Sequence, residues 1–227
     1  MMSVIAENLQ SVQTRIQLAC QAAGRDPASV RLLAVSKTFG ADEVRQAHAA
    51  GQTAFGENYI QEGVDKIQAL QDLDLEWHCI GPIQSNKTRL VAEHFDWVHS
   101  VDRLKTAQRL SAQRPASMPP LQVCIQVNID GGENKSGALP DQALALAQAV
   151  AALPQLQLRG LMTIPEPQGD VALTRAVHAQ ARALWLQLQS QGLYLDTLSM
   201  GMTADLEAAV QEGSTMVRVG TAIFGRR

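Results

Sequence analysis

The sequence predicts a single (β/α)₈ barrel, and three observations indicate it. Eight short apolar runs alternate with helical segments along the 227 residues, which is typical of βαβ units and a parallel sheet. A barrel of eight strand–helix units takes roughly 200 residues or more, so this length suits one. The G-x-G-x-x-G fingerprint of an open nucleotide-binding sheet is absent after the first run, where the chain reads AVSKTFG. We expect one domain over residues 1–227.

An additional helix is expected before the first strand. Apolar residues recur at steps of three and four from Ile5 to Ala23, which is the spacing of one buried helical face. Ser3 can cap the start of this helix and Gly24 can end it. Because the strand–helix repeat begins only after this segment, the helix is an N-terminal addition to the barrel.

The expected strands are short and almost continuously apolar, because barrel strands face a packed interior on one side and helices on the other. They are residues 32–35, 53–55, 77–80, 97–99, 121–127, 158–161, 197–199 and 216–219. Helices with recognisable starts lie between them. Asp42, Asp102, Asp170 and Thr203 stand at the starts of four, and Pro140 fits the first turn of a fifth.

Composition and charge exclude several classes of protein. The formal net charge of −3 and the lack of long Lys or Arg runs argue against a nucleic-acid binder. Cys20, Cys79 and Cys124 lie far apart, and the histidines lack zinc-site spacing, so we expect no metal site and a reducing compartment. No stretch approaches the roughly 20 apolar residues of a membrane span, and the N-terminus lacks the apolar core of a signal peptide. We expect a cytoplasmic protein that binds no membrane.

Lys37 is the first candidate for chemistry, because functional side chains of barrels follow the C-terminal ends of strands. It comes directly after the apolar run LLAVS. We expect burial there to disfavour its ammonium form, which leaves a free amine able to attack a carbonyl. The alternative is a lysine whose ammonium group extends from the strand end into solvent.

The last two strand ends, SMGMT and VRVGT, indicate a phosphate site. Each combines glycine with a hydroxyl residue at the place where barrels bind phosphate: Ser199 with Gly201, and Gly220 with Thr221. Glycine allows backbone N–H groups to approach phosphate oxygens. Both glycines could instead be tight turns. Together with Lys37, the pair predicts a phosphorylated aldehyde as cofactor.

Two further residues follow strand ends. Arg218 lies between Val217 and Val219, which indicates a buried cation; an ion pair with a carboxylate across the barrel is an equally good interpretation. Asn58 belongs to the GENY segment after the second strand, where it could also simply cap a helix.

Seven motifs resemble one known family, and they run in order over nearly the whole chain: LLAVSKT, FGENYIQEGVDK, EWHCIGPIQSNK, KSG, RGLMTIP, LSMGMTADLEAA and GSTMVRVGTAIFG. This is the pyridoxal phosphate homeostasis protein family, single-domain relatives of the alanine racemase N-terminal barrel. The resemblance implies pyridoxal 5′-phosphate (PLP) bound as a Schiff base on Lys37. It implies phosphate contacts from Ser199, Gly201, Gly220 and Thr221, Arg218 against the pyridine nitrogen, and Asn58 near the cofactor.

One departure concerns the residues after Lys37, where relatives often carry a proline and this chain has Phe39-Gly40. The departure leaves the lysine itself in place. It leaves open the shape of the entrance to the site.

The expected function is PLP storage, buffering or delivery to apo-enzymes by a monomer without robust turnover. Arg218 is a permanent cation that cannot accept a hydrogen bond from a protonated ring nitrogen, so the cofactor would be a weak electron sink. Alanine racemases use a second base from an additional domain, and this chain ends at FGRR soon after the last strand. A small PLP-dependent amino-acid racemase and a cofactor-free Schiff-base aldolase are the alternatives.

Overall fold

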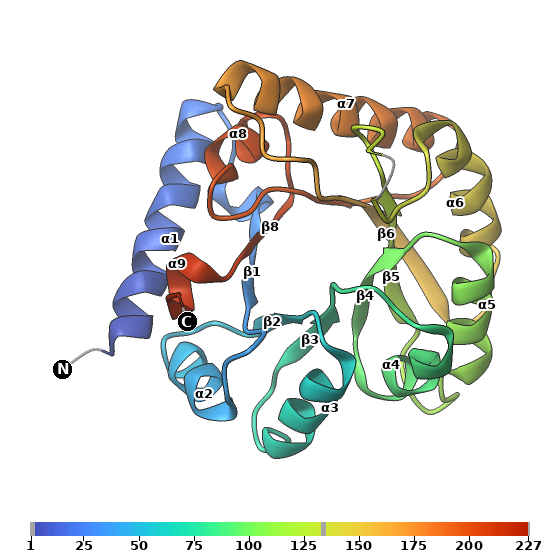
Figure 1. Cartoon of the computed structure of the whole chain (residues 1–227), viewed down its shortest axis with the longest axis horizontal. Coiled ribbons are helices and arrows are strands. Elements are labelled where there is room, and N and C mark those ends of the chain that lie inside the picture. Colours follow the sequence, from blue (N-terminus) through green and yellow to red (C-terminus); the bar gives the residue numbers. More distant parts are fainter. Residues whose placement is uncertain (1–2, 133–134, 227) are drawn as a thin grey trace.

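The eight apolar runs form a closed barrel. A computed structural model describes residues 3–132 and 135–226, and in it parallel strands pair in sequence order around the barrel until β8 meets β1. Figure 1 shows the strands at the centre and the helices outside them. The strands are β1 Arg31–Val35, β2 Ala54–Glu57, β3 Glu76–Cys79, β4 Trp97–Val101, β5 Leu121–Val127, β6 Leu156–Thr163, β7 Thr197–Ser199 and β8 Met216–Val219. The predicted (β/α)₈ barrel is confirmed.

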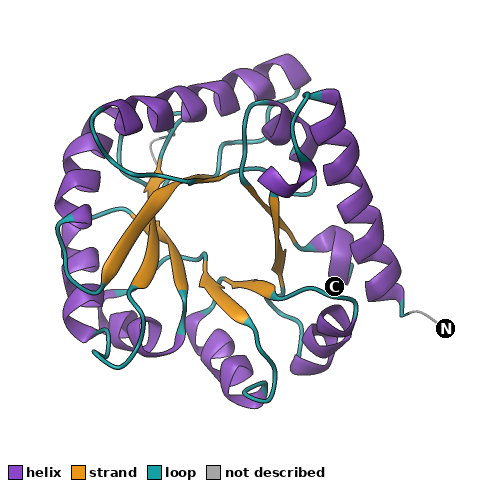
Figure 2. Ribbon diagram, turned by 180° about the vertical axis from the view of Figure 1, so that it is seen from behind, coloured by secondary structure: helices purple, strands orange, loops and turns teal. Residues whose placement is uncertain are grey.

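Helices cover the barrel on all sides (Figure 2). One α-helix precedes the first strand and one follows each strand: α1 Val4–Ala22, α2 Ala41–Ala49, α3 Ile60–Ala69, α4 Thr88–His94, α5 Leu104–Gln113, α6 Ala143–Ala151, α7 Val171–Ser190, α8 Leu206–Gln211 and α9 Thr221–Phe224. The short 3₁₀ helices Pro27–Ser29, Ser85–Lys87 and Pro140–Gln142 lie in the connections. Most of the apolar core lies between the strands and this helical layer.

The N-terminal helix α1 compensates for a short last helix. As predicted, the Ser3 hydroxyl accepts the Ala6 N–H at 3.2 Å and caps α1. The apolar face of α1 is buried, and the helix packs against α2, α8 and α9. Asn8 Nδ2 also donates to the carbonyl of Ile223 in α9 at 2.9 Å. Because α9 has only 4 residues, α1 supplies the cover that a longer final helix would give.

Some predicted helix starts are wrong in detail. Asp170 caps α7 as expected, but Asp102 does not cap α5, whose N-cap is Arg103 with no side-chain cap bond. The helix expected from Thr203 begins only at Leu206, because the intervening residues form a turn. Two local hydrogen bonds hold this turn, from the Met202 N–H to Asp205 Oδ1 at 2.7 Å and from the Asp205 N–H to the Met202 carbonyl at 3.3 Å.

The barrel interior is partly polar. Two small apolar clusters, one around Leu33 and one around Trp97, are separate from the large outer core. His78 and His99 are fully buried and hydrogen-bonded to each other, and His99 also contacts Ser199 on the far side of the barrel. A contact between β4 and β7 must pass through the interior, so these polar side chains fill its centre.

Candidate functional site

A cavity of about 770 Å³ lies at the C-terminal ends of the strands. Its wall comes from the loops after β1, β2, β6 and β7, the end of β3, strand β8 and α9. Five of the seven predicted site residues line it: Lys37, Asn58, Arg218, Gly220 and Thr221. Residues from opposite ends of the sequence therefore meet at one mouth of the barrel, where barrel enzymes carry their sites.

Lys37 lies exposed at the rim of this cavity. Strand β1 ends at Val35, so the side chain leaves the sheet instead of running beside it, and the burial expected from the sequence is wrong. Among the described residues, the Lys37 amine has neither a hydrogen bond nor an ion pair. Its exposed position and the lack of a polar partner leave this side chain accessible to a carbonyl compound.

The backbone on both sides of Lys37 is held by α3. Thr38 has φ 68°, a left-handed conformation that is uncommon for a β-branched residue and costs free energy. Its N–H donates to Glu62 Oε1 at 2.6 Å. The Lys66 ammonium donates to the same Glu62 oxygen and to the carbonyl of Ser36, each at 2.7 Å. The residues before and after Lys37 are thus both linked to Lys66, Ser36 directly and Thr38 through Glu62.

A buried carboxylate completes this group. Lys66 Nζ donates to Glu57 Oε1 at 2.7 Å, and the Ser36 hydroxyl donates to the same oxygen at 2.6 Å. Glu57 is fully buried and Lys66 is 5% exposed. Burial raises the pKa of Glu57, although Lys66 and Ser36 oppose the shift. The sequence gives no signal for this pair, because β2 and α3 bring its members together only in the fold.

Lys66→Met should destabilise the protein, because Glu57 is fully buried beside Lys66. Removing the cation leaves the Glu57 carboxylate unpaired, and we expect a loss of about 3 kcal/mol in the free energy of unfolding near neutral pH. Because the folded-state pKa of Glu57 is raised, the loss should be smallest in acid and grow as pH rises through that pKa. Urea unfolding across pH measures it. Adding Glu57→Gln to Lys66→Met should restore most of the stability; a loss that persists in this double variant contradicts the explanation.

Arg218 is a buried cation fixed by oxygen atoms. Its Nη1 donates to the carbonyl and the hydroxyl of Ser199, and its Nη2 donates to the carbonyl of Thr163, all at 2.8 Å. Among the described residues it forms no ion pair with a carboxylate, so the ion-pair interpretation is wrong. Burial lowers the pKa of Arg218 to about 10, and the guanidinium therefore remains charged at neutral pH while it lines the cavity.

Ser199 and Gly201 do not lie on the cavity wall. Ser199 is fully buried in β7, where its hydroxyl contacts Arg218 and, at 3.0 Å, His99 Nδ1. Gly201 has φ 93°, and its carbonyl accepts the backbone N–H of Arg218 at 3.0 Å. Thr203 lines the cavity instead, and the sequence interpretation overlooked it. Thr203 is the second hydroxyl residue of SMGMT and follows the end of β7. Because site residues of a barrel follow the strand ends, its place in the sequence could have indicated this role.

Gly220 and Thr221 line the cavity after β8, the strand that pairs with β1. Gly220 is the N-cap of α9, and the first N–H groups of a helix have no partners within it. A Cβ at Gly220 would lie 3.1 Å from the carbonyl oxygen of Val35, so little space is left for a side chain. Thr221 is exposed to the cavity. Backbone N–H groups and a hydroxyl at this wall can bind an anionic oxygen.

Phe39 shapes the entrance. Its ring stacks on that of Phe224 with centroids 5.3 Å apart, and it forms part of the cavity wall. Gly40 caps α2, and its N–H donates to Glu43 Oε2 at 2.9 Å. The Phe39-Gly40 departure therefore joins the loop after Lys37 to α9.

Other kinds of site are absent from the described part of the chain. No group of three His, Cys, Asp or Glu residues there is arranged to hold a metal ion, and none of its helices has the length and hydropathy needed to cross a bilayer. Cys20, Cys79 and Cys124 are buried free thiols.

Comparison with known proteins places this geometry in a family. Residues 7–227 match the model of the alanine racemase N-terminal domain. The chain is 63% identical to the pyridoxal phosphate homeostasis protein of Pseudomonas aeruginosa, over 100% of this chain and 97% of the relative. The Escherichia coli K12 protein of the same name is 53% identical, over 100% and 98%. The chain belongs to the pyridoxal phosphate homeostasis protein family.

Solved structures agree with this membership. PipY of Synechococcus elongatus with PLP bound, a family relative at 43% identity, superposes with a TM-score of 0.86 and covers 97% of this chain and 100% of its own. Alanine racemase of Corynebacterium glutamicum has a TM-score of 0.70 at 19% identity, and this chain covers 61% of it. The second likeness concerns the fold alone.

Proposed function

We propose that the protein binds PLP covalently through Lys37 and stores, buffers or delivers it. The observation that carries the proposal is the accessible, unpartnered amine of Lys37 in one cavity with Gly220 and Thr221. An aldehyde reacts with such an amine, and a phosphate suits the backbone N–H groups and the hydroxyl at Gly220 and Thr221. The names of the relatives and the PLP-bound structure of PipY support the same ligand.

The residues present fit this group. A cavity of about 770 Å³ has the size of a cofactor site. In the proposed arrangement Gly220, Thr221 and Thr203 bind the phosphate, Arg218 faces the ring nitrogen, and Asn58 lies beside the ring. Ser199 and Gly201 would then act by holding Arg218 rather than by contacting the phosphate, which revises the expectation from the sequence.

We propose further that the site lacks robust turnover. Bound PLP supplies an electron sink, which is strongest when an acidic side chain keeps its ring nitrogen protonated. Arg218 has only donors and cannot do this. The described cavity wall contains no Asp, Glu, His, Cys or Tyr, so Lys37 is its one ordinary base. A racemase needs a second base on the other face of the substrate carbon, which favours the carrier over the racemase.

Chirally resolved assays of the PLP-loaded protein on a panel of amino acids test this choice. We expect no racemisation or transamination at ordinary enzymatic rates, which are on the order of 1–10³ per second. Delivery is tested by reactivation of a PLP-dependent apo-enzyme by the loaded protein at a fixed total of PLP. Racemisation at enzymatic rates would replace the carrier with the racemase.

Thr221→Val tests the phosphate wall, because it removes a hydroxyl and keeps the shape of the side chain. We expect the affinity for PLP to fall roughly tenfold, as for the loss of a hydrogen bond to a charged group. The affinity for pyridoxal, which lacks the phosphate, should change little. Thr53→Val at the opposite mouth of the barrel is the matched control. Equal losses for both ligands would show that Thr221 acts through the fold.

The remaining expectations are also proposals. We propose one PLP-binding domain over residues 1–227, a monomer, a cytoplasmic location and apo-enzymes as recipients of the cofactor. Three free cysteines in the described chain support a reducing compartment. Light scattering of the loaded protein measures its mass in solution and decides the oligomeric state.

A further inference from the structure

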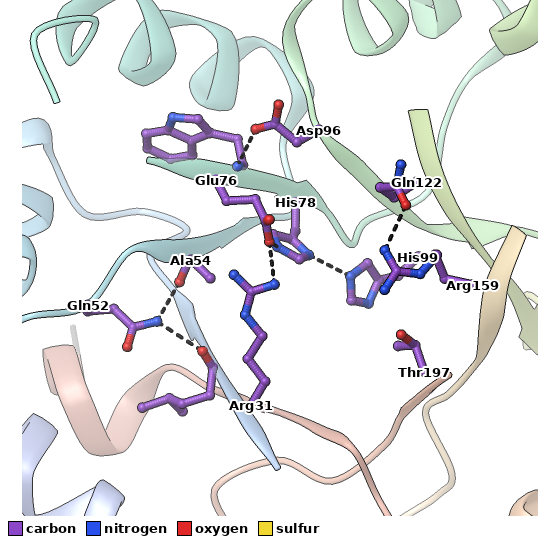
Figure 3. A network of polar contacts seen from close by, with 12 residues as sticks. Arg31, Gln52, Ala54, Glu76, His78, Asp96, His99, Gln122, Arg159 and Thr197 are labelled. Carbon is purple, nitrogen blue, oxygen red and sulfur yellow. Dashed lines mark hydrogen bonds and ion pairs between the residues drawn. The ribbon is translucent and has the colours of Figure 1, made fainter. Parts of the chain in front are cut away.

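A chain of hydrogen bonds crosses the barrel from its N-terminal mouth to the cofactor cavity. Glu76 lies at the N-terminal mouth beside a depression of about 660 Å³, where Oε1 contacts Arg31 at 2.7 Å and His78 Nε2 at 2.6 Å. His78 Nδ1 lies 2.8 Å from His99 Nε2, and Figure 3 shows these contacts. His99 Nδ1 then meets the Ser199 hydroxyl, which Arg218 also contacts.

The carboxylate end sets the direction of this chain. The Arg31 and His78 contacts lower the pKa of Glu76 to about 2 despite its partial burial, so Glu76 can only accept and His78 Nε2 must carry a proton. Burial lowers the pKa of both histidines, and a neutral imidazole has one donor and one acceptor nitrogen. His78 Nδ1 is therefore an acceptor, His99 Nε2 a donor and His99 Nδ1 an acceptor.

The arginine end requires the same direction. Arg218 has only donors, so the Ser199 oxygen accepts from it. The Ser199 hydroxyl is fully buried, and among the described residues His99 Nδ1 is the acceptor within reach of its proton. A protonated His99 Nδ1 would leave that hydroxyl proton unsatisfied, at a cost of about 1–3 kcal/mol. Both ends thus give one direction: Arg218 donates to Ser199, Ser199 to His99, His99 to His78, and His78 to Glu76.

We propose that His99 and Ser199 are positioning residues that orient Arg218 for the ring nitrogen of the cofactor. This series of hydrogen bonds ends at the Arg218 guanidinium, which keeps its protons, so the series does not conduct protons to the cavity. The series instead supplies a fixed acceptor, the Ser199 oxygen, for Arg218 Nη1. The Ser199 hydroxyl and the two histidine rings each have a single orientation in which all their hydrogen bonds form. Trp97 stacks on the His78 ring with centroids 5.1 Å apart and keeps that ring in place.

The positioning role rests on the proposed function, since it concerns the contact between Arg218 and bound PLP. The direction of the hydrogen bonds does not depend on that function. Nitrogen NMR of the histidine rings in the cofactor-free protein therefore tests it separately. At neutral pH we expect both His78 and His99 to carry their proton on Nε2. A proton on Nδ1 of either ring would contradict the proposed direction of the hydrogen bonds.

The effect on Arg218 is measured with PLP and with an analogue that has carbon in place of the ring nitrogen. Ser199→Ala and His99→Leu should each reduce the preference for PLP over the analogue about tenfold. Because His99 acts through Ser199, the double variant should lose no more than either single variant. General damage to the fold would weaken both ligands equally and leave the preference unchanged.

Ser214→Ala is the matched control. Ser214 is also a fully buried serine, but its hydroxyl donates to backbone carbonyls such as that of Met200 and does not contact Arg218. We expect it to lower stability and keep the preference for PLP. Additive losses in the Ser199 and His99 variants, or a preference unchanged in both, overturn the positioning role. If wild type shows no preference for PLP, the proposed contact of Arg218 with the ring nitrogen fails, whatever the NMR result.

Discussion

Lys37→Ala should abolish covalent attachment of PLP, because only a primary amine at this position can bond to the aldehyde. Binding through the phosphate wall and Arg218 should remain, so we expect weak non-covalent affinity and loss of the absorbance band of the covalent form. Borohydride treatment followed by mass analysis of peptides measures the attachment directly. Lys105→Ala, on the exposed surface of α5, is the control and should keep full labelling at Lys37.

A labelled Lys37→Ala protein would mean that another lysine carries the cofactor. Lys135 is the one to examine first, since its ammonium donates to Asp130 and to the carbonyl of Ile164, a residue of the cavity wall. The stability of the cofactor-free protein should not change in Lys37→Ala, because this side chain is exposed and lacks polar partners in the described structure. A large loss of stability would contradict that description.

Arg218→Glu is expected to be the most destabilising of these substitutions. A carboxylate at this position would give the ring nitrogen of PLP an acceptor, and we would then expect slow transamination. In the structure, the guanidinium is surrounded by the carbonyls of Ser199 and Thr163 and by the Ser199 hydroxyl. A carboxylate there faces oxygen atoms, and the two carbonyls lose their donor. We expect a loss of about 3–5 kcal/mol in the free energy of unfolding.

Urea unfolding of the cofactor-free protein measures this effect, with Lys105→Glu on the exposed surface of α5 as the control for a change from a cation to a carboxylate. The control should leave stability unchanged. Any transamination by Arg218→Glu must then be expressed per bound cofactor, because much of the protein will lack PLP. A variant as stable as wild type would show that the carboxylate is protonated or has moved out of the interior.

The sequence by itself determined the barrel, its N-terminal helix and five of the residues that line the cavity. Apolar periodicity records which face of an element is buried, and the strand ends of a barrel all meet at one mouth. That is why Lys37 and Gly220, far apart in the chain, could be assigned to one site before any coordinate was known.

The tertiary structure alone decided the environment of those residues. The exposure of Lys37 depends on where β1 stops, and the position of Thr203 rather than Ser199 on the cavity wall depends on the length of β7. The Glu57–Lys66 pair and the chain from Glu76 to Arg218 join side chains from different strands and helices. Hydrogen bonds of this kind leave no periodic pattern in a sequence, because each depends on the relative placement of two elements rather than on the propensity of either one.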